Sequence, residues 1–356
     1  MAENLSVIEP HGASNSTCGY CSPQGSRSAT KSNFQESAIV AYELTCDVYQ
    51  RMIDRGWRRS GTYCYKPLLS LSCCPQYTIK LDACAFAPSK SQRKLLNRWN
   101  RYVLEGDTNE KESKMNIDNV RDRCIHAVPS KPPSQPTSLE TLIHASEQGF
   151  TKDITPRHTF QVTLEPSSYT SEKFALFKSY EANIHKSLNK TPGSFDSFLV
   201  KSPLTYVPVP YTSTPPDHLP KTFGSYHQLY RLDGKLIMLN TIDVLPACVS
   251  SVYCIWDKEF EKYSLGKLSA LREASLAREI HQAGVTSMRY LYMGFYIYTC
   301  PKMRYKGEYS PSYLADPEGC AWHPLENCNA LLDKHRYACF THPEHSVVNM
   351  PDPNEG

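Results

Sequence analysis

Four cysteines near the N-terminus have the residue type and spacing of a metal site. Cys18 and Cys21 form a Cys-x-x-Cys pair, and Cys73 and Cys74 are adjacent about fifty residues later. Two such pairs supply four thiolates, which suit zinc or an iron–sulfur cluster. The long tyrosine-rich and basic stretch between the pairs is unlike the short spacing of a zinc ribbon. We therefore expect the cysteines to clasp two distant segments of one domain.

Composition limits the class of protein. The 356 residues suit about two domains. The chain shows neither a secretory signal nor a run of eighteen apolar residues, which predicts no membrane span, a cytoplasmic or nuclear location and fourteen reduced cysteines. Disulfides are the alternative. Cysteines outside the two pairs, such as Cys46, Cys64 and Cys84, are expected to be small buried hydrophobes. A net charge of +3 is too small to indicate nucleic-acid binding by itself.

Changes in apolar density along the chain predict two folded domains. The polar composition between the two domains cannot bury enough apolar surface to offset chain entropy, which indicates a linker or insertion. The expected parts are a disordered N-terminus at 1–17, an N-terminal domain with the four-cysteine site at 18–103, the linker at 104–156, a second domain at 157–342 and a tail at 343–356.

The second domain has a readable order of elements. Ser225–Leu232 and Lys235–Val244 flank Asp233-Gly234, a two-residue hairpin signal. The elements expected next are a strand at Val249–Trp256, a helix from an N-cap at Ser264 to Gln282 with Gly284 as its stop, and a strand at Tyr290–Cys300. This order predicts an acyltransferase-type α/β (α+β) fold, in which two strands splay beside a helix N-terminus that can face phosphates.

Several blocks of the sequence resemble arginyl-tRNA–protein transferases. In the N-terminal part they are CGYC (18–21), DRGWRRSG (54–61), CCPQYTI (73–79) and PSKSQRK (88–94). In the second part they are YTSEKF (169–174), GSYHQ (224–228), DVLP (243–246), YSLGK (263–267) and CPKMRYK (300–306). The blocks occur in the family's order, and the resemblance covers both folded parts but not the linker or the ends.

The resemblance implies transfer of arginine from charged tRNA(Arg) to the N-terminal α-amine of proteins that begin with Asp, Glu or oxidised Cys. The product would be marked for ubiquitin-dependent degradation in the Arg/N-degron pathway, with a ubiquitin ligase acting downstream. The family also implies a GNAT-like module. Its zinc or iron–sulfur centre would be held here by Cys18, Cys21, Cys73 and Cys74.

The implied reaction makes modest demands on a catalytic site. An N-terminal amine has a pKa of about 7.7–8.0, so a sizeable neutral fraction exists near pH 7. Positioning of two substrates can lower the barrier by about 7–11 kcal/mol. The catalytic candidates are Tyr226, His227, Gln228 and Asp243. Strand alternation places His227 opposite its two neighbours, and a structural histidine is the alternative to a proton acceptor. Asp243 could hold the arginyl guanidinium or orient the amine, or it could cap a turn.

Substrate recognition needs cations for the acidic acceptor residue. Lys302, Arg304 and Lys306 alternate along a segment that could place their charges on one edge, and Arg272 on the predicted helix is a further candidate. Solvated or phosphate-binding charges are the alternative. The donor-binding candidates at the start of the predicted helix are Ser264, Gly266 and Lys267.

A basic stripe predicts a surface for tRNA. The stripe recurs at helical spacing beside an apolar face of Leu95, Trp99 and Tyr102, so it could follow phosphates while the apolar face docks. A solvated helix face is the alternative. The tRNA-binding candidates are Lys90, Arg93, Lys94, Arg98 and Arg101, together with Arg58 and Arg59 around Trp57, which could instead brace the metal site.

Two other classes of protein share parts of this pattern. A non-catalytic zinc-containing RNA- or degron-binding module would need the cysteines and basic patches but not the acyltransferase order. An acetyl-coenzyme A-dependent enzyme would need a glycine-rich pyrophosphate loop before its helix. Residues 264–270 contain a single glycine, which favours a donor other than coenzyme A.

Overall fold

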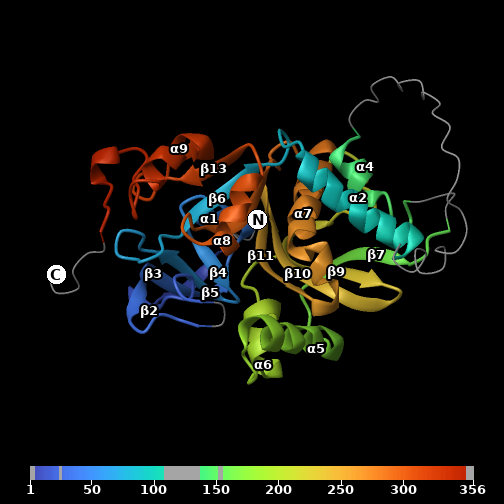
Figure 1. Cartoon of the computed structure of the whole chain (residues 1–356), viewed down its shortest axis with the longest axis horizontal. Helices are drawn as coiled ribbons and strands as arrows, with labels where there is room; N and C mark the ends of the chain where they lie inside the picture. Colours follow the sequence, from blue (N-terminus) through green and yellow to red (C-terminus); the bar gives the residue numbers. More distant parts are fainter. Residues whose placement is uncertain (1–4, 24–25, 108–136, 151–154, 350–356) are drawn as a thin grey trace, which may run out of the picture.

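The computed structural model describes residues 5–23, 26–107, 137–150 and 155–349, which fold around two β-sheets (Figure 1). The smaller sheet is N-terminal and has the order β1-β3-β5-β4, with β2 paired to β3. Its strands are β1 (Val7–Pro10), β2 (Ser14–Thr17), β3 (Lys31–Glu43), β4 (Arg58–Ser60) and β5 (Tyr63–Pro67). The prediction of a disordered N-terminus is therefore wrong for its described part, because β1 and β2 both pair with the long strand β3.

The larger sheet joins both halves of the chain. Its order is β14-β13-β6-β12-β11-β10-β9-β7, with β8 paired to β9. β6 comes from the N-terminal half yet pairs with β12 and β13 (Figure 1), so the predicted division near residue 103 does not separate two sheets. The strands are β6 (Tyr77–Asp82), β7 (Phe160–Pro166), β8 (Val207–Pro208), β9 (Thr222–Leu232), β10 (Lys235–Leu245), β11 (Cys248–Trp256), β12 (Tyr290–Tyr296), β13 (Ser312–Ala315) and β14 (Trp322–Pro324).

The centre of the larger sheet follows the sequence prediction closely. β9 and β10 form the expected hairpin, and Asp233 and Gly234 have φ angles of 50° and 82°, as a type I′ turn requires. β11 and β12 are parallel but pair only between 248–250 and 290–292. Beyond that point β12 pairs with β6 alone, so β11 and β12 diverge.

Helices cover both faces of this sheet. α7 packs on β11 and β12, with α4 and α2 beside it, and α5 packs on β10 and β11. Figure 1 shows α2, α4 and α7 together, and α5 and α6 apart from them. The α-helices are α1 (Cys46–Ile53), α2 (Lys90–Glu105), α4 (Leu139–His144), α5 (Ser171–Tyr180), α6 (Pro192–Phe195), α7 (Leu265–Gln282), α8 (Pro301–Arg304) and α9 (Leu325–Leu332). The other helical turns are η1 (Glu181–His185), η2 (Asp196–Val200), η3 (Lys258–Tyr263), η4 (Tyr305–Glu308) and η5 (Pro343–His345).

Local sequence explains the two long helices. α2 begins with a capping box, in which the side chains of Ser89 and Gln92 bond each other's backbone N–H groups. In α7, Leu271, Ala274 and Ala277 are fully buried on the sheet, as their spacing predicts. Ser264 does not cap α7 with its side chain, because it lies in the left-handed region at φ 53°.

The expected linker and tail are structured where they are described. Residues 108–136 and 151–154 of the expected linker lie outside the described residues. The remainder contributes the end of α2 and the whole of α4, which packs on α7. In the expected tail, Val347 pairs with Tyr337. Within the described ranges, the helices are all too short or too polar to cross a membrane.

Candidate functional site

The four cysteines predicted to bind a metal lie together. Their sulfur atoms are all within 4.8 Å of one another, and the Sγ atoms of Cys21 and Cys73 are 3.7 Å apart. Zinc–sulfur bonds of about 2.3 Å in a tetrahedron place sulfurs about 3.8 Å apart, so the arrangement fits a four-thiolate site. Cys18 and Cys74 are buried and Cys21 is exposed, so one side of the cluster faces solvent.

The surroundings of the cluster ease the ionisation of one cysteine and oppose that of another. Burial opposes ionisation of Cys18, but hydrogen bonds from the backbone N–H groups of Tyr20 and Cys21 lower its pKa overall. Burial and the hydrogen bond and charge of Cys18 raise the pKa of Cys73 to about 11. A bound cation would stabilise the remaining thiolates, as four-cysteine metal sites require.

The cysteine cluster packs against the segment that follows β12. Cys18 and Cys74 share a small apolar cluster with Ile297 and Cys300, and Met303 of α8 packs against it. The segment 301–308 is helical, as α8 and η4. The prediction that alternation places its three cations on one edge is therefore wrong.

Lys306 and Arg58 form a pair of neighbouring cations beside this cluster. β12 changes register between Tyr292 and Phe295, where Gly294 has φ +71°. The Nη2 of Arg58 donates to the Gly294 carbonyl at 3.3 Å, and the Nζ of Lys306 donates to the Phe295 carbonyl at 2.7 Å. The Arg58 guanidinium lies 5.4 Å from the ring centres of both Tyr292 and Phe295.

This cation pair has no counter-charge in the described part of the chain. Burial, together with the charge of Arg58, lowers the pKa of Lys306 to about 7. Burial also lowers the pKa of Arg58, and the groups that oppose this shift are phenols and a thiol rather than carboxylates. Arg58 is only 6% exposed, so its predicted contact with tRNA phosphates is wrong. The pair instead suits a small anionic group.

The other predicted acceptor-binding cations lie elsewhere. Lys302 is exposed, and Arg304 lies over the Tyr298 ring at 4.2 Å and donates to its hydroxyl at 3.1 Å. Arg272 is buried on α7 and forms two hydrogen bonds to Glu147, at 2.6 and 2.9 Å. Its predicted contact with substrate is therefore wrong, because its guanidinium joins α7 to the segment after α4.

Asp243 and Arg59 form a buried ion pair that joins the two sheets. The Nε of Arg59 donates to one carboxylate oxygen of Asp243 at 2.8 Å, and its Nη2 donates to the other oxygen at 2.5 Å and to Ser225 at 2.8 Å. The two side chains are 1% and 0% exposed. Asp243 thus holds a guanidinium, but that of β4 rather than of a substrate, and Arg59 cannot contact tRNA as predicted.

His227 has both ring nitrogens engaged and faces α5. Its Nδ1 accepts from the buried Lys173 ammonium at 3.1 Å, and its Nε2 donates to the Leu199 carbonyl at 2.9 Å. Burial lowers the pKa of His227 to about 4, and the charge of Lys173 adds to this effect. The predicted role as proton acceptor is not supported by this arrangement, because the histidine has no free lone pair. The structural alternative fits it.

Tyr226 and Gln228 face away from His227, as strand alternation predicts. The Tyr226 hydroxyl donates to the Thr222 carbonyl at 2.8 Å. The side-chain oxygen of Gln228 accepts from the Tyr230 hydroxyl at 2.7 Å. Asn240 continues this contact, since its side-chain nitrogen donates to that hydroxyl at 3.4 Å and to Glu273 at 3.2 Å.

Glu273 of α7 is a buried carboxyl that the sequence interpretation missed. Burial raises its pKa to about 7, although Ser269 and Ser251 donate hydrogen bonds to it. Its Oε2 and the side-chain oxygen of Asn240 lack a hydrogen-bond partner in the described structure. The signal available in the sequence was spacing, because Glu273 lies three or four residues from Ser269, Ala270, Leu276 and Ala277, which are apolar or small and buried.

The predicted donor-binding residues lie at the start of α7, near the gap between β11 and β12. A side chain at Gly266 would lie 3.7 Å from the Trp256 ring. Lys267 pairs with Glu308 at 3.1 Å, and its carbonyl accepts from the Tyr309 hydroxyl. Ser264 makes no side-chain cap. These contacts tie the helix start to η4, the turn that carries Lys306.

The predicted tRNA-binding helix has the expected faces. Trp99 and Leu96 are buried, while Leu95 and Tyr102 are partly buried. The exposed cations of α2 are Lys90, Arg93, Lys94, Arg98 and Arg101.

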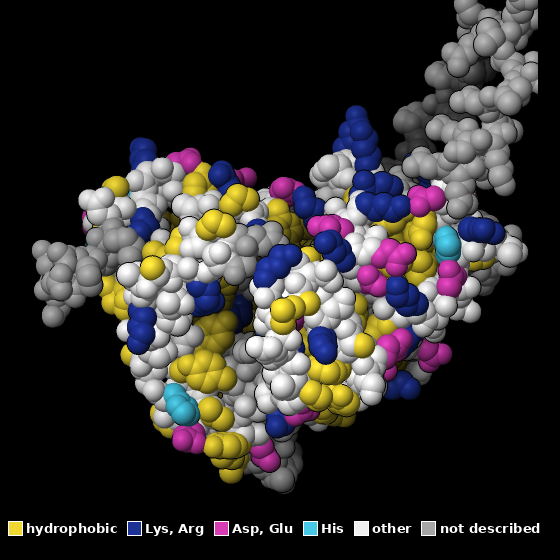
Figure 2. Space-filling model, turned by 60° about the horizontal axis from the view of Figure 1, so that its bottom comes forward, with side chains coloured by type: hydrophobic (Ala, Val, Ile, Leu, Met, Phe, Trp, Pro, Cys, Tyr) yellow, Lys and Arg dark blue, Asp and Glu magenta, His cyan; other side chains and the backbone are white. Residues whose placement is uncertain are grey.

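On another face, Figure 2 shows a hollow between the part that carries β2–β5 and the part that carries α5 and α6. Hydrophobic side chains line this hollow, and Lys or Arg side chains lie at its edge.

Comparisons with known proteins agree with the sequence motifs. Residues 16–94 match the family model described as "Arginine-tRNA-protein transferase, N terminus", and residues 172–316 match that of its "C terminus". A Campylobacter jejuni protein named "Aspartate/glutamate leucyltransferase" is 33% identical over 26% of this chain and 36% of that protein.

Longer relatives carry the same family name. "Arginyl-tRNA--protein transferase 1" of Arabidopsis thaliana is 28% identical over 94% of this chain and 76% of that protein. The protein of that name from Drosophila melanogaster is 32% identical over 94% of this chain and 85% of its own length. Both family models match in order, and a relative above 30% identity is covered for most of its length, so this chain belongs to the arginyl-tRNA–protein transferase family.

Proposed function

We propose that this protein transfers arginine from Arg-tRNA to the N-terminal α-amine of proteins that begin with Asp, Glu or oxidised Cys. The observation that carries the acceptor specificity is the pair Arg58 and Lys306, two close cations without a carboxylate partner in the described chain. Asp, Glu and the oxidised forms of Cys all present a small anion. The Campylobacter relative, named for aspartate and glutamate, supports this choice.

The donor would enter a GNAT-like gap between β11 and β12. Support for this fold comes from the short parallel pairing of these strands and from the crossover helix α7 that begins beside their diverging ends. Acyl donors sit in such a gap with phosphates near the helix N–H groups. The five exposed cations of α2 would follow the tRNA backbone in this arrangement.

Positioning would supply most of the rate enhancement. The acceptor amine is partly neutral near pH 7 and can attack the ester carbonyl once both substrates are held together. A proton must then leave the amine. Our candidate acceptor is Glu273, whose pKa of about 7 suits proton exchange and which a hydrogen bond from Asn240 holds in place.

The metal centre would act structurally. Cys18, Cys21, Cys73 and Cys74 would hold zinc or an iron–sulfur cluster. A bound centre supplies a rigid cross-link between loops rather than a step in the transfer. Because the cluster packs on Ile297 and Cys300, that cross-link would fix the segment that carries Lys306.

The product would carry an N-terminal arginine. We propose that this arginine marks the substrate for ubiquitin-dependent degradation, with a ubiquitin ligase acting downstream, in the cytoplasm or the nucleus. The added arginine gives the substrate a cationic first side chain in place of an anionic one. One transfer therefore changes which proteins recognise the substrate.

A non-catalytic RNA- or degron-binding module is the second candidate, favoured by the exposed basic face of α2 alone. The deciding experiment uses the purified full chain, Arg-tRNA with labelled arginine and a peptide that begins with Asp. Label on the peptide supports the transferase. Binding of tRNA and peptide without transfer of label supports the module.

A further inference from the structure

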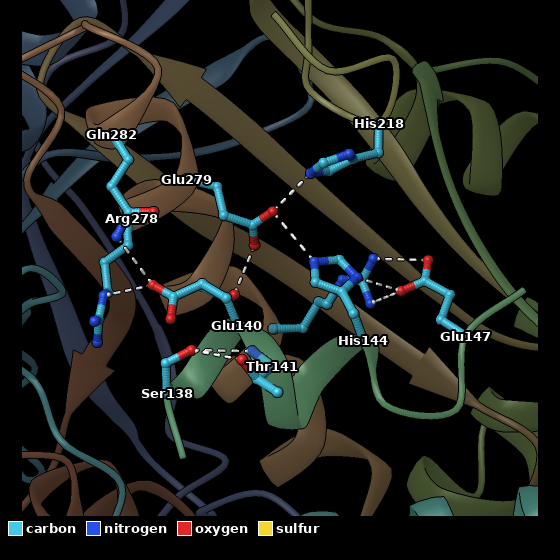
Figure 3. Close-up of polar contacts among 11 residues, drawn as sticks. Ser138, Glu140, Thr141, His144, Glu147, His218, Arg278, Glu279 and Gln282 are labelled. Atoms are coloured by element: carbon cyan, nitrogen blue, oxygen red, sulfur yellow. Dashed lines mark hydrogen bonds and ion pairs between the residues drawn. The ribbon is translucent and has the colours of Figure 1, made fainter. Parts of the chain in front are cut away.

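Two histidines and a glutamate from three distant segments meet on the α7 side of the larger sheet (Figure 3). His144 ends α4, His218 precedes β9 and Glu279 lies in the last turns of α7. One oxygen of Glu279 lies 3.2 Å from the Nε2 of His144 and 2.6 Å from the Nε2 of His218. The three groups can each turn one ligand atom to a common point, since those atoms all lie within 4.8 Å of one another.

The surroundings of these residues orient them as metal ligands are oriented. The Nδ1 of His144 lies 2.8 Å from Glu147, whose carboxylate also bonds Arg272. A proton on Nδ1 donated to Glu147 would leave Nε2, which faces Glu279 (Figure 3), able to ligate a cation in place of its hydrogen bond to that carboxylate. The other oxygen of Glu279 accepts from Ser275 at 2.6 Å. Carboxylate–histidine contacts of this kind hold the ligands of zinc sites in place.

The site is sheltered and can still be reached from solvent. The side chains of His144 and Glu279 are 9% and 12% exposed, and that of His218 is 26% exposed. The Phe150 ring stacks on His144 with centres 3.8 Å apart and meets His218 edge-on at 5.2 Å. The Phe150 ring therefore covers part of the site, and the partly exposed His218 gives an ion a route to it.

We propose that His144, His218 and Glu279 bind a divalent transition-metal ion of the zinc type, at a site separate from the four cysteines. Imidazole nitrogen and carboxylate oxygen are ligands that zinc accepts at about 2.0–2.2 Å. Tetrahedral geometry with such bonds places ligand atoms about 3.3 Å apart, close to the 3.2 Å between His144 and Glu279. The atoms of His218 and Glu279 are 2.6 Å apart and would separate when the ion binds. Solvent takes the fourth position.

The bound ion would fasten three segments that are otherwise linked by hydrogen bonds. α4 packs on α7, and Glu147, in the segment after α4, pairs with Arg272 of α7. A metal ion that also ligates His218 would add the loop before β9 to this contact. The site would therefore stabilise the α4 side of the fold without taking part in transfer.

Cobalt titration tests the proposal. The metal-depleted full chain is titrated with Co(II) in the absence of oxygen, and bound cobalt is compared with thiolate-to-cobalt absorption, which reports binding through cysteine. We expect one equivalent of cobalt that binds without adding thiolate absorption. His218→Gln and Glu279→Gln should each lose this equivalent and keep the thiolate band. His11→Gln, which changes an exposed histidine on the N-terminal side, should keep it.

Thermal unfolding gives a second readout that does not depend on spectroscopy. A metal that binds only the folded state raises Tm, so zinc should stabilise the wild-type chain more than the His218→Gln chain. The proposal is overturned if all bound cobalt brings thiolate absorption, or if His218→Gln retains the additional equivalent. Equal zinc-dependent Tm increases in wild type and His218→Gln would also overturn it.

Discussion

Replacement of Lys306 by methionine tests whether the charge of this lysine binds the acidic acceptor. The change removes the ammonium that lies beside Arg58 and keeps a flexible apolar side chain of similar length. The position is half-buried, and its ammonium donates to the Phe295 carbonyl and to the Met303 sulfur. We expect Lys306→Met to fold, to bind Arg-tRNA normally and to lose its preference for acidic acceptors.

The size of the loss follows from the two cations. A carboxylate about 4 Å from one cation gains about 4 kcal/mol at an effective dielectric constant of about 20. Removal of one partner from a desolvated charge pair costs about 2–5 kcal/mol. Arg58 remains in the variant and retains part of the attraction. We therefore expect a loss of about 2–4 kcal/mol, which is about 30- to 1,000-fold in kcat/KM for an acceptor with N-terminal Asp.

The same lysine predicts a pH dependence. Lys306 is protonated below its pKa of about 7 and neutral above it, so its attraction for the carboxylate is lost as the pH rises through 7. The measured quantity is the ratio of kcat/KM for matched peptides that begin with Asp and Asn. In this ratio the pH dependence that comes from ionisation of the acceptor α-amine cancels, because both peptides share it. This ratio should fall with rising pH in the wild type. In Lys306→Met it should be low and independent of pH.

Steady-state transfer from labelled Arg-tRNA measures both effects, and Lys302→Met is the matched control. Lys302 is an exposed lysine four residues away, so its loss should change kcat/KM for the Asp peptide by less than about threefold. Similar losses in the two variants would refute the reasoning. So would a Lys306→Met chain that keeps its preference for Asp over Asn.

Three further variants test other parts of the structure. Asp243→Asn leaves Arg59 buried without its counter-charge and should cost about 3–5 kcal/mol of unfolding free energy in urea, whereas Asp107→Asn in an exposed pair should cost less than about 1 kcal/mol. Glu273 has a folded pKa of about 7, above its usual 4.5, so the wild type should lose about 3 kcal/mol of stability as the pH rises from 4.5 through 7. Glu273→Gln should abolish that loss and lower kcat at pH 7 by about 100-fold; unchanged pH dependence of Tm would contradict the first effect. Lys90→Gln with Lys94→Gln should reduce the slope of log affinity for tRNA against log salt by about 1.5, while Lys178→Gln with Lys186→Gln, both exposed on the α5 side, should leave the slope unchanged.

Local patterns predicted the central elements correctly. The Asp233-Gly234 hairpin, the buried face of α7 and the exposed cations of α2 each depend on residues close in sequence. The two cysteine pairs are distant in sequence. Such pairs are typical of metal sites, so the proximity of the four cysteines in the structure could be expected.

Pairings across the chain could not be predicted in the same way. Arg59 and Asp243 are 184 residues apart, and a basic residue beside tryptophan gives no sign of a buried partner at that distance. The same limit explains β6, whose sequence does not reveal that it pairs with β12 and β13. Glu147 lies in a segment of linker-like composition, and its role depends on Arg272 on a distant helix.

The site of arginine addition on defined peptides shows most directly whether this protein arginylates acidic N-termini. The full chain is incubated with Arg-tRNA and peptides that differ only in beginning with Asp, Glu, Ala or Nα-acetylated Asp, and the products are sequenced by mass spectrometry. We expect one arginine on the α-amine of the Asp and Glu peptides and none on the other two. Equal addition to the Ala peptide, or no addition to any peptide by folded protein that binds Arg-tRNA, would contradict this expectation.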